Sequence, residues 1–128
     1  MNTTRDRVWL WAPVVLYMGL IFGLSSISHP PELPAGSGSD KYVHAALYAG
    51  LSALWIRARA GGWLTPVTLG IAVSAVMFST AYGITDELHQ FLVPPRQVEV
   101  LDVAADAIGA ALAAGLLYAG IIRGRHGL

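Results

Sequence analysis

The sequence contains no cysteine and few charged residues, and both shortages limit what the protein can be. Without cysteine, disulfides, iron–sulfur clusters and thiolate metal sites are excluded. Only 12% of the 128 residues are charged, whereas a soluble domain has about a quarter. Together with a hydrophobic content of 55%, this excludes a water-soluble enzyme domain, a disordered tail and a nucleic-acid-binding protein with a basic face.

What the chain has instead is a series of long apolar stretches. They predict an all-α integral membrane protein, a single domain with four transmembrane helices at about residues 8–27, 40–59, 66–91 and 102–122. The second and fourth reach the ~20 residues of a bilayer crossing only if their polar ends are included. The first is too long for the ~7–15-residue core of a cleaved signal peptide, so we expect it to remain as a helix.

Turn-forming residues separate these segments. Three prolines and a glycine–serine run at residues 29–39 cannot continue a helix, and Pro94-Pro95 stops the third one. Gly61-Gly62 is expected to end the second helix, and Thr65-Pro66 to cap and begin the third.

The zero net charge hides a separation of signs along the chain. In an up-down-up-down bundle one end would hold six arginines: Arg5, Arg7, Arg57, Arg59, Arg123 and Arg125. The acids, except Asp6, would gather at the other end with Lys41 and Arg96. Because positive residues favour the cytoplasmic side, we expect both termini in the cytoplasm.

The polar residues of the opposite end are the candidate site. Asp40, His44 and Tyr48 share a helix face, Asp102 and Asp106 are one turn apart, and Glu87 is expected on a face beside the Tyr82, Asp86, His89 and Gln90 stripe. Candidate catalytic residues are His44, Asp86, Glu87, Gln90, Arg96 and Asp102; candidate ligand-binding residues are Lys41, Tyr48, Arg96 and Asp106. So many acids cannot all ionise cheaply, so we expect a protonated carboxyl, a charged histidine or a bound cation.

Three interpretations of this cluster stay open. A carboxyl or His44 can carry a proton while Lys41 and Arg96 hold an anionic group of an outer-leaflet ligand. Lys41–Asp86 or Arg96–Asp106 pairs can instead serve only to fix the helix register. A metal site is the least favoured. His44 and His89 with Asp86, Glu87, Asp102 or Asp106 are suitable ligand types, but their spacing fits the known metal motifs poorly. The sequence requires no cofactor.

Small residues on the helices allow close packing. Gly19-x-x-x-Gly23, Ala46-x-x-x-Gly50 and Ala105-x-x-x-Gly109-x-x-x-Ala113 suit either packing within the bundle or a homo-oligomer, and internal packing is the default.

The ordered polar set has a counterpart in a known family. Ser25-Ser26, then Asp40-Lys41-x-x-His44-x-x-x-Tyr48, then Tyr82 and Asp86-Glu87-x-x-Gln90, then Arg96, Asp102 and Gly109 resemble the VanZ-like family of small bacterial membrane proteins. The family often has asparagine where this chain has Asp106, which adds an acid here.

The family is named for low-level resistance to the glycopeptide teicoplanin. The resemblance implies a multi-pass protein of the bacterial inner membrane with a cell-envelope role, and no particular reaction. We therefore expect the lipid bilayer as one partner and an envelope precursor or lipid-linked ligand as another. The alternative is a structural scaffold whose polar cluster only locks the helices. An ion conduit is disfavoured because the apolar parts of the helices hold no ionisable relay.

Overall fold

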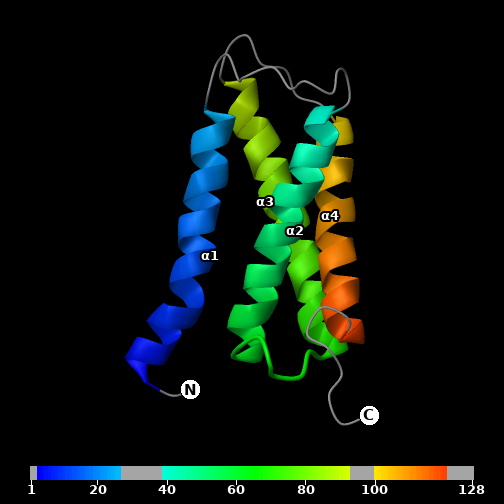
Figure 1. Cartoon of the computed structure of the whole chain (residues 1–128). Coiled ribbons are helices and arrows are strands. Elements are labelled where there is room, and N and C mark those ends of the chain that lie inside the picture. The colour runs from blue at the N-terminus through cyan, green and yellow to red at the C-terminus, as the bar shows by residue number, and fades with distance from the viewer. Residues whose placement is uncertain (1–2, 27–38, 93–99, 121–128) are drawn as a thin grey trace.

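The computed structural model describes residues 3–26, 39–92 and 100–120, with only the backbone at positions 39 and 40. These residues form four α-helices and no strand: α1 (Thr4–Ser25), α2 (Ser39–Ala60), α3 (Leu69–Phe91) and α4 (Val100–Ala119). Figure 1 shows them side by side as one bundle. The all-α architecture predicted from the sequence is confirmed.

Three of the helices, α1, α3 and α4, are long and apolar enough to cross a membrane. The second helix is less apolar than these three, because Asp40 and Lys41 stand at its start and Arg57 and Arg59 in its last turn. An apolar helix with much of its surface exposed is expected in lipid rather than water. Large side chains such as Leu16 on α1, Met77 on α3 and Leu112 on α4 are indeed exposed.

The largest differences from the predicted helix boundaries are at the starts of α3 and α1. The third helix begins at Leu69 rather than residue 66, because Thr68 is the N-cap and its hydroxyl accepts from Ile71 N at 3.1 Å. Thr65 instead donates to Gly62 O at 2.8 Å and completes the preceding turn. The first helix begins a turn early, at Thr4, since the Thr3 hydroxyl accepts from the Asp6 amide.

The other boundaries follow the sequence more closely. Helix α2 ends at Ala60, and Gly61 and Gly62 follow with φ of 92° and 145°, a backbone region that favours glycine. Helix α4 begins two residues before the predicted start, and the predicted ends at residues 27 and 122 lie outside the described residues.

The closest packing is between α2 and α4. A side chain at Gly109 would collide with the backbone carbonyl of Ala45, so the two helices approach almost backbone to backbone. Ser52 reinforces the contact by donating to Ala110 O at 3.0 Å. The small-residue face of α4 thus serves the bundle interior, where Ala105 and Ala113 are also buried.

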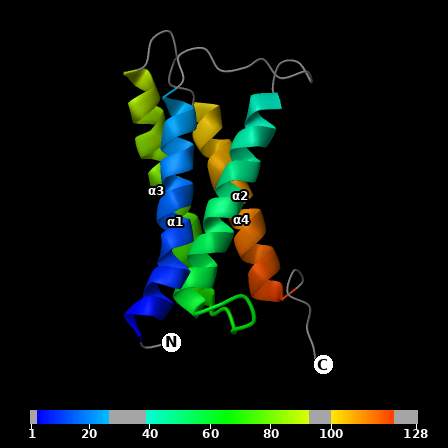
Figure 2. The same ribbon diagram turned by 60° about the vertical axis from the view of Figure 1, so that its left-hand side comes forward.

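Helix α1 lies at the outside of the bundle, at the left in Figure 1 and in front of α3 in Figure 2. It packs against α2 and α3, and within the described ranges it has no contact with α4. Gly19 and Gly23 have no neighbouring atom within 4 Å where a side chain would stand, so this small-residue pair is not used in the internal packing. Two tyrosine hydroxyls tie α1 to its neighbours: Tyr17 donates to Leu47 O and Tyr82 to Met18 O, each at 2.7 Å.

A buried arginine joins α1 to α2 at the end opposite the acids. Pro13 has no amide hydrogen, so the carbonyl of Trp9, four residues earlier, loses its helical donor. Arg57 is 8% exposed and donates to this carbonyl at 3.2 Å and to Leu10 O at 3.4 Å. Its guanidinium also lies over the Trp9 and Trp63 rings, 5.8 and 6.0 Å from their centroids.

Candidate functional site

Polar side chains of three helices are buried together at one end of the bundle. Helix α3 contributes its last turns, and α2 and α4 contribute their first turns. The buried polar residues from α3 and α4 are Asp86, Glu87, Gln90, Asp102 and Asp106. From α2, Lys41 and His44 point into the same group. We call Lys41, His44, Asp86, Glu87, Asp102 and Asp106 the polar cluster.

Lys41 is paired with Asp102. Its ammonium nitrogen lies 2.6 Å from Asp102 Oδ1, and the lysine side chain is 26% exposed while the aspartate is 7% exposed. The predicted partner, Asp86, is therefore wrong for Lys41. The reason is that α4 lies against α2 along its length, which brings the start of one helix beside the start of the other.

His44 lies between the two aspartates of α4. Its Nδ1 is 2.8 Å from Asp106 Oδ1, and its Nε2 is 3.6 Å from Asp102 Oδ2. Asp102 and Asp106 are four residues apart, so both carboxylates point from the same face of the helix toward one imidazole. The predicted Arg96–Asp106 pair cannot be compared, because Arg96 lies outside the described residues.

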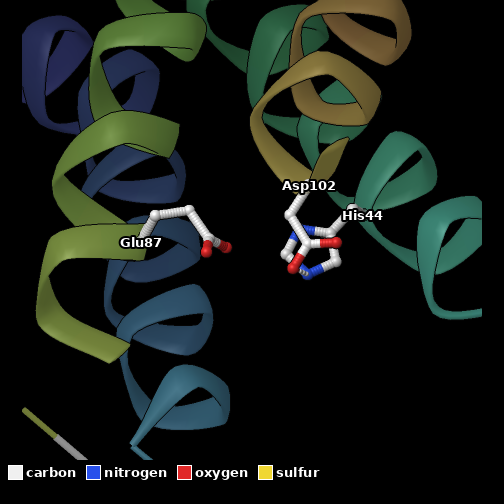
Figure 3. A group of neighbouring side chains, drawn as sticks. All are labelled: His44, Glu87 and Asp102. Carbon is white, nitrogen blue, oxygen red and sulfur yellow. Dashed lines mark ion pairs between the residues drawn. The ribbon is translucent and has the colours of Figure 1, made fainter. Parts of the chain in front are cut away.

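Glu87 enters the cluster from the opposite side. Its side chain is 2% exposed, and Figure 3 shows it pointing from α3 toward His44 and Asp102. One donor atom each from His44, Glu87 and Asp102 lie within 4.8 Å of one another. The sequence placed Glu87 on a face beside the α3 stripe, whereas the structure turns it into the interior.

Several polar atoms in and beside the polar cluster are buried without a hydrogen-bond partner in the described part of the chain. The Tyr48 hydroxyl, Asp86 Oδ1, Asp106 Oδ2 and the Ser79 hydroxyl are fully buried and have no hydrogen-bond partner among the described residues. Tyr48 and the Ser25 hydroxyl lie close to the Asp86 carboxyl. Buried polar atoms are normally satisfied, so these four atoms are candidates to bind water or a ligand group.

Gly83 makes room for one of these carboxylates. A side-chain carbon at this position would lie 2.6 Å from Asp106 Oδ2 and 3.2 Å from Asp106 Cβ. Sequence reasoning missed both Gly83 and Ser79. The available signal was their position on the same helix face as Asp86, at helical spacing.

His89 lies apart from the cluster. Its Nε2 is 2.9 Å from the Ser26 hydroxyl, and its ring stacks on Phe22 with the centroids 4.3 Å apart. The sequence grouped His89 with His44 and the acids Asp86, Glu87, Asp102 and Asp106 as candidate metal ligands, but the structure turns His89 toward α1. Among the described residues of that set, His44, Glu87 and Asp102 are the ones whose donor atoms lie close enough to share an ion.

The remaining candidate residues divide in two. Gln90 is buried at 3% exposure, one turn beyond Asp86 on α3. Asp40 is in the first turn of α2, but its side chain lies outside the described part of the chain, as does all of Arg96.

Three of the helices are apolar and long enough to span a bilayer, and acids and a histidine are gathered between the helices at one end. These features define a small membrane protein with an internal polar site. The family model of VanZ/LLP1 matches residues 10–123. The chain therefore belongs to the VanZ/LLP1 family, as the ordered polar residues indicated. No curated protein and no solved structure gave a significant match.

Proposed function

We propose that this VanZ-like protein spans the inner membrane of a bacterium four times, up-down-up-down, with both termini in the cytoplasm. The charge distribution supports this orientation. Arg57 and Arg59 stand at the end of α2 and Arg5 and Arg7 at the start of α1, away from the polar cluster. Under the positive-inside rule these arginines stay in the cytoplasm, and the polar cluster then faces the outside of the cell.

Helix α2 is the fourth span in this proposal. Its polar residues lie in its end turns, where charged side chains cost far less than at the bilayer centre. Its middle is apolar and packs tightly on α4, which shields it from lipid.

The proposed role of the polar cluster is to bind or modify a component of the cell envelope, and thereby to give low-level tolerance to a glycopeptide such as teicoplanin. The observation that carries this proposal is the burial of four carboxyl groups with Asp86 Oδ1 and Asp106 Oδ2 unsatisfied. Polar atoms buried without partners destabilise a bundle, so a purely structural role does not explain them. Hydroxyl or amine donors of an outer-leaflet ligand would supply partners for these oxygens, while an anionic group of the same ligand could lie near Lys41.

Orientation can be tested with single cysteines, because the chain has none of its own. Leu92 and Leu64 are 74% and 85% exposed and lie beyond opposite ends of α3. A membrane-impermeant maleimide should label Leu92→Cys in intact cells and Leu64→Cys only after permeabilisation. The reverse pattern would overturn the orientation.

The role can be tested with a substitution that preserves shape. Asp86→Asn replaces a buried carboxyl group by an amide of the same shape, and Asp6→Asn makes the same substitution at the other end of the bundle. We expect Asp86→Asn to abolish teicoplanin tolerance at an unchanged protein level in the membrane, and Asp6→Asn to leave it intact. Full tolerance of Asp86→Asn at normal protein level would contradict the proposed site.

A second candidate function, a structural scaffold, is favoured by the direct Lys41–Asp102 and His44–Asp106 contacts. In that case the polar cluster only holds α2 against α4. It predicts that every loss of tolerance is matched by an equal loss of protein from the membrane, which the immunoblot in the same experiment measures.

A further inference from the structure

The polar cluster contains a set of donors that suits a metal ion. His44 comes from α2, Glu87 from α3 and Asp102 from α4, and their donor atoms lie within 4.8 Å of one another (Figure 3). We propose that these three side chains bind one divalent transition-metal ion of the zinc class. The inference stands on donor geometry and does not depend on drug tolerance or on the identity of an envelope ligand.

The distances are close to those of a bound site. Zinc holds nitrogen and carboxylate oxygen at about 2.0–2.2 Å, so the donors of a tetrahedral site are about 3.4 Å apart. His44 Nε2 and Asp102 Oδ2 are already 3.6 Å apart. The Glu87 carboxylate would have to move by roughly an ångström to reach the same ion. Rotation about the side-chain bonds of a flexible glutamate allows this movement.

The side chains behind the donors orient them as metal ligands are usually oriented. Histidine ligands commonly donate their second ring nitrogen to a carboxylate. Asp106 Oδ1 occupies this position, 2.8 Å from His44 Nδ1, which leaves Nε2 facing Asp102. Lys41 forms an ion pair with Asp102 Oδ1, so Asp102 Oδ2 faces the imidazole. Both ligands therefore present one atom to the same space.

The charges also favour a cation. Among the described residues, four carboxyl groups of the polar cluster are buried against one partly exposed lysine and one imidazole. A divalent ion would neutralise most of this excess where burial makes unpaired charge costly. Glu87, Asp102 and Asp106 all act electrostatically on His44, so the ion would stand at the centre of the negative charge.

A further independent observation is one unsatisfied carboxylate oxygen beside the site. Asp86 is 5% exposed, lies in the electrostatic neighbourhood of His44, and has a buried Oδ1 with no hydrogen-bond partner in the described structure. A metal held by three protein ligands keeps an open position for water or a ligand oxygen. Asp86 and Tyr48 are the neighbouring groups that can hydrogen-bond an occupant of that position.

The ligand types select the class of ion. One imidazole with two carboxylates suits zinc, manganese or iron. Magnesium and calcium prefer oxygen alone, and copper(I) prefers the thiolates that this chain lacks. Zinc is the probe of choice, and cobalt(II) its spectroscopic substitute.

A different arrangement of protons explains the same distances without metal. A doubly protonated His44 would bridge Asp106 through Nδ1 and Asp102 through Nε2. In that arrangement the imidazole has no lone pair to give to an ion. The experiment must therefore distinguish a coordinating histidine from a bridging one.

The test uses the full chain, purified in detergent, with any affinity tag removed and metal stripped by a chelator. We expect titration with zinc to show one ion per chain, and cobalt(II) to give visible absorption bands of a low-coordinate site. His44→Gln, Glu87→Gln and Asp102→Asn should each weaken zinc binding by on the order of 100-fold or more, and Asp106→Asn by about 10- to 100-fold.

Two matched variants serve as controls. His89→Gln changes the other described histidine, which lies near the same end but contacts Ser26 and Phe22, and Asp6→Asn removes an acid from the far end. Both should bind zinc like the wild type. Thermal unfolding adds a second measurement: zinc should raise the Tm of the wild type and of His89→Gln, but not that of His44→Gln.

The proposal is overturned if folded wild-type protein shows no saturable zinc binding, or if His89→Gln weakens binding as much as His44→Gln. A ring 15N spectrum that shows His44 doubly protonated in the presence of zinc would also overturn it. Failure here leaves the drug-tolerance assay and the labelling assay unaffected, so the two proposals can fail separately.

Discussion

The Tyr17 ring of α1 occupies the space that Gly50 of α2 leaves by having no side chain. A carbon attached to Gly50 would collide with the tyrosine hydroxyl, which donates to Leu47 O at 2.7 Å. The glycine therefore decides where α1 attaches to the rest of the bundle.

Gly50→Ala should displace Tyr17 and break its hydrogen bond, at a cost of about 1–2 kcal/mol in unfolding free energy. Tyr17→Phe removes the same hydrogen bond without adding atoms and should cost about 1 kcal/mol. The measurement is unfolding in a graded mixture of detergent and SDS. Gly19→Ala is the control, because nothing lies within 4 Å of the added carbon. An equal loss in Gly19→Ala would refute the assignment.

Gly83→Ala should rotate the Asp106 carboxylate away from His44, because the new carbon would stand 2.6 Å from Oδ2. We expect a loss of about 1–3 kcal/mol from overpacking. The 15N shift of His44 Nδ1 should also change as its hydrogen bond to Asp106 lengthens. Gly115→Ala, on the α4 surface with no atom within 4 Å, should leave both measurements near wild type.

Arg57→Gln should loosen α1 from α2. Charge-assisted hydrogen bonds contribute about 1.5–3 kcal/mol, and the Trp9 carbonyl would regain no helical donor because of Pro13. Arg59→Gln removes the same charge from an exposed position two residues away and serves as the matched control. The expected readout is faster proteolysis near the start of α1 in Arg57→Gln alone. Equal proteolysis in both variants would point to net charge instead.

The pairing of Lys41 can be tested by a double-mutant cycle. Lys41→Met and Asp102→Asn should show a coupling energy of about 1 kcal/mol, within the range for residues in contact. A parallel cycle of Lys41→Met with Asp86→Asn should show a coupling near zero, because Asp102 holds the lysine. A larger coupling energy in the second cycle would contradict the Lys41–Asp102 pair and support the Lys41–Asp86 pair expected from the sequence.

The sequence was sufficient for the helices but not for the contacts of the polar cluster. Apolar runs and turn residues locate four helices, since both signals are local along the chain. Which acid pairs with Lys41 depends on the rotation of α3 and α4 about their axes, and no local pattern encodes that rotation. The prediction of Asp86 therefore failed, while the shared face of Asp102 and Asp106 followed from their spacing.

Glu87 and His89 show the same limit. Adjacent helical residues differ by about 100° in direction, so a narrow stripe through Asp86 excludes Glu87. In the structure α3 lies against both α2 and α4, and its buried surface is wide enough for Asp86 and Glu87 together. His89 then falls at the edge that faces α1. The width of a buried surface depends on how many helices cover it, which only the assembled bundle determines.

The polar attachments of α1 through Tyr17, Tyr82 and Arg57 all end on main-chain oxygens. Every amino acid offers such an oxygen, so replacing Leu47, Met18, Trp9 or Leu10 leaves the acceptor in place. The donors have no such freedom. As far as these hydrogen bonds are concerned, evolutionary drift at this interface should thus be one-sided: the two tyrosines and the arginine must persist, whereas the side chains at the accepting positions are constrained only by their packing, as Trp9 is by Arg57 and Leu10 by the core.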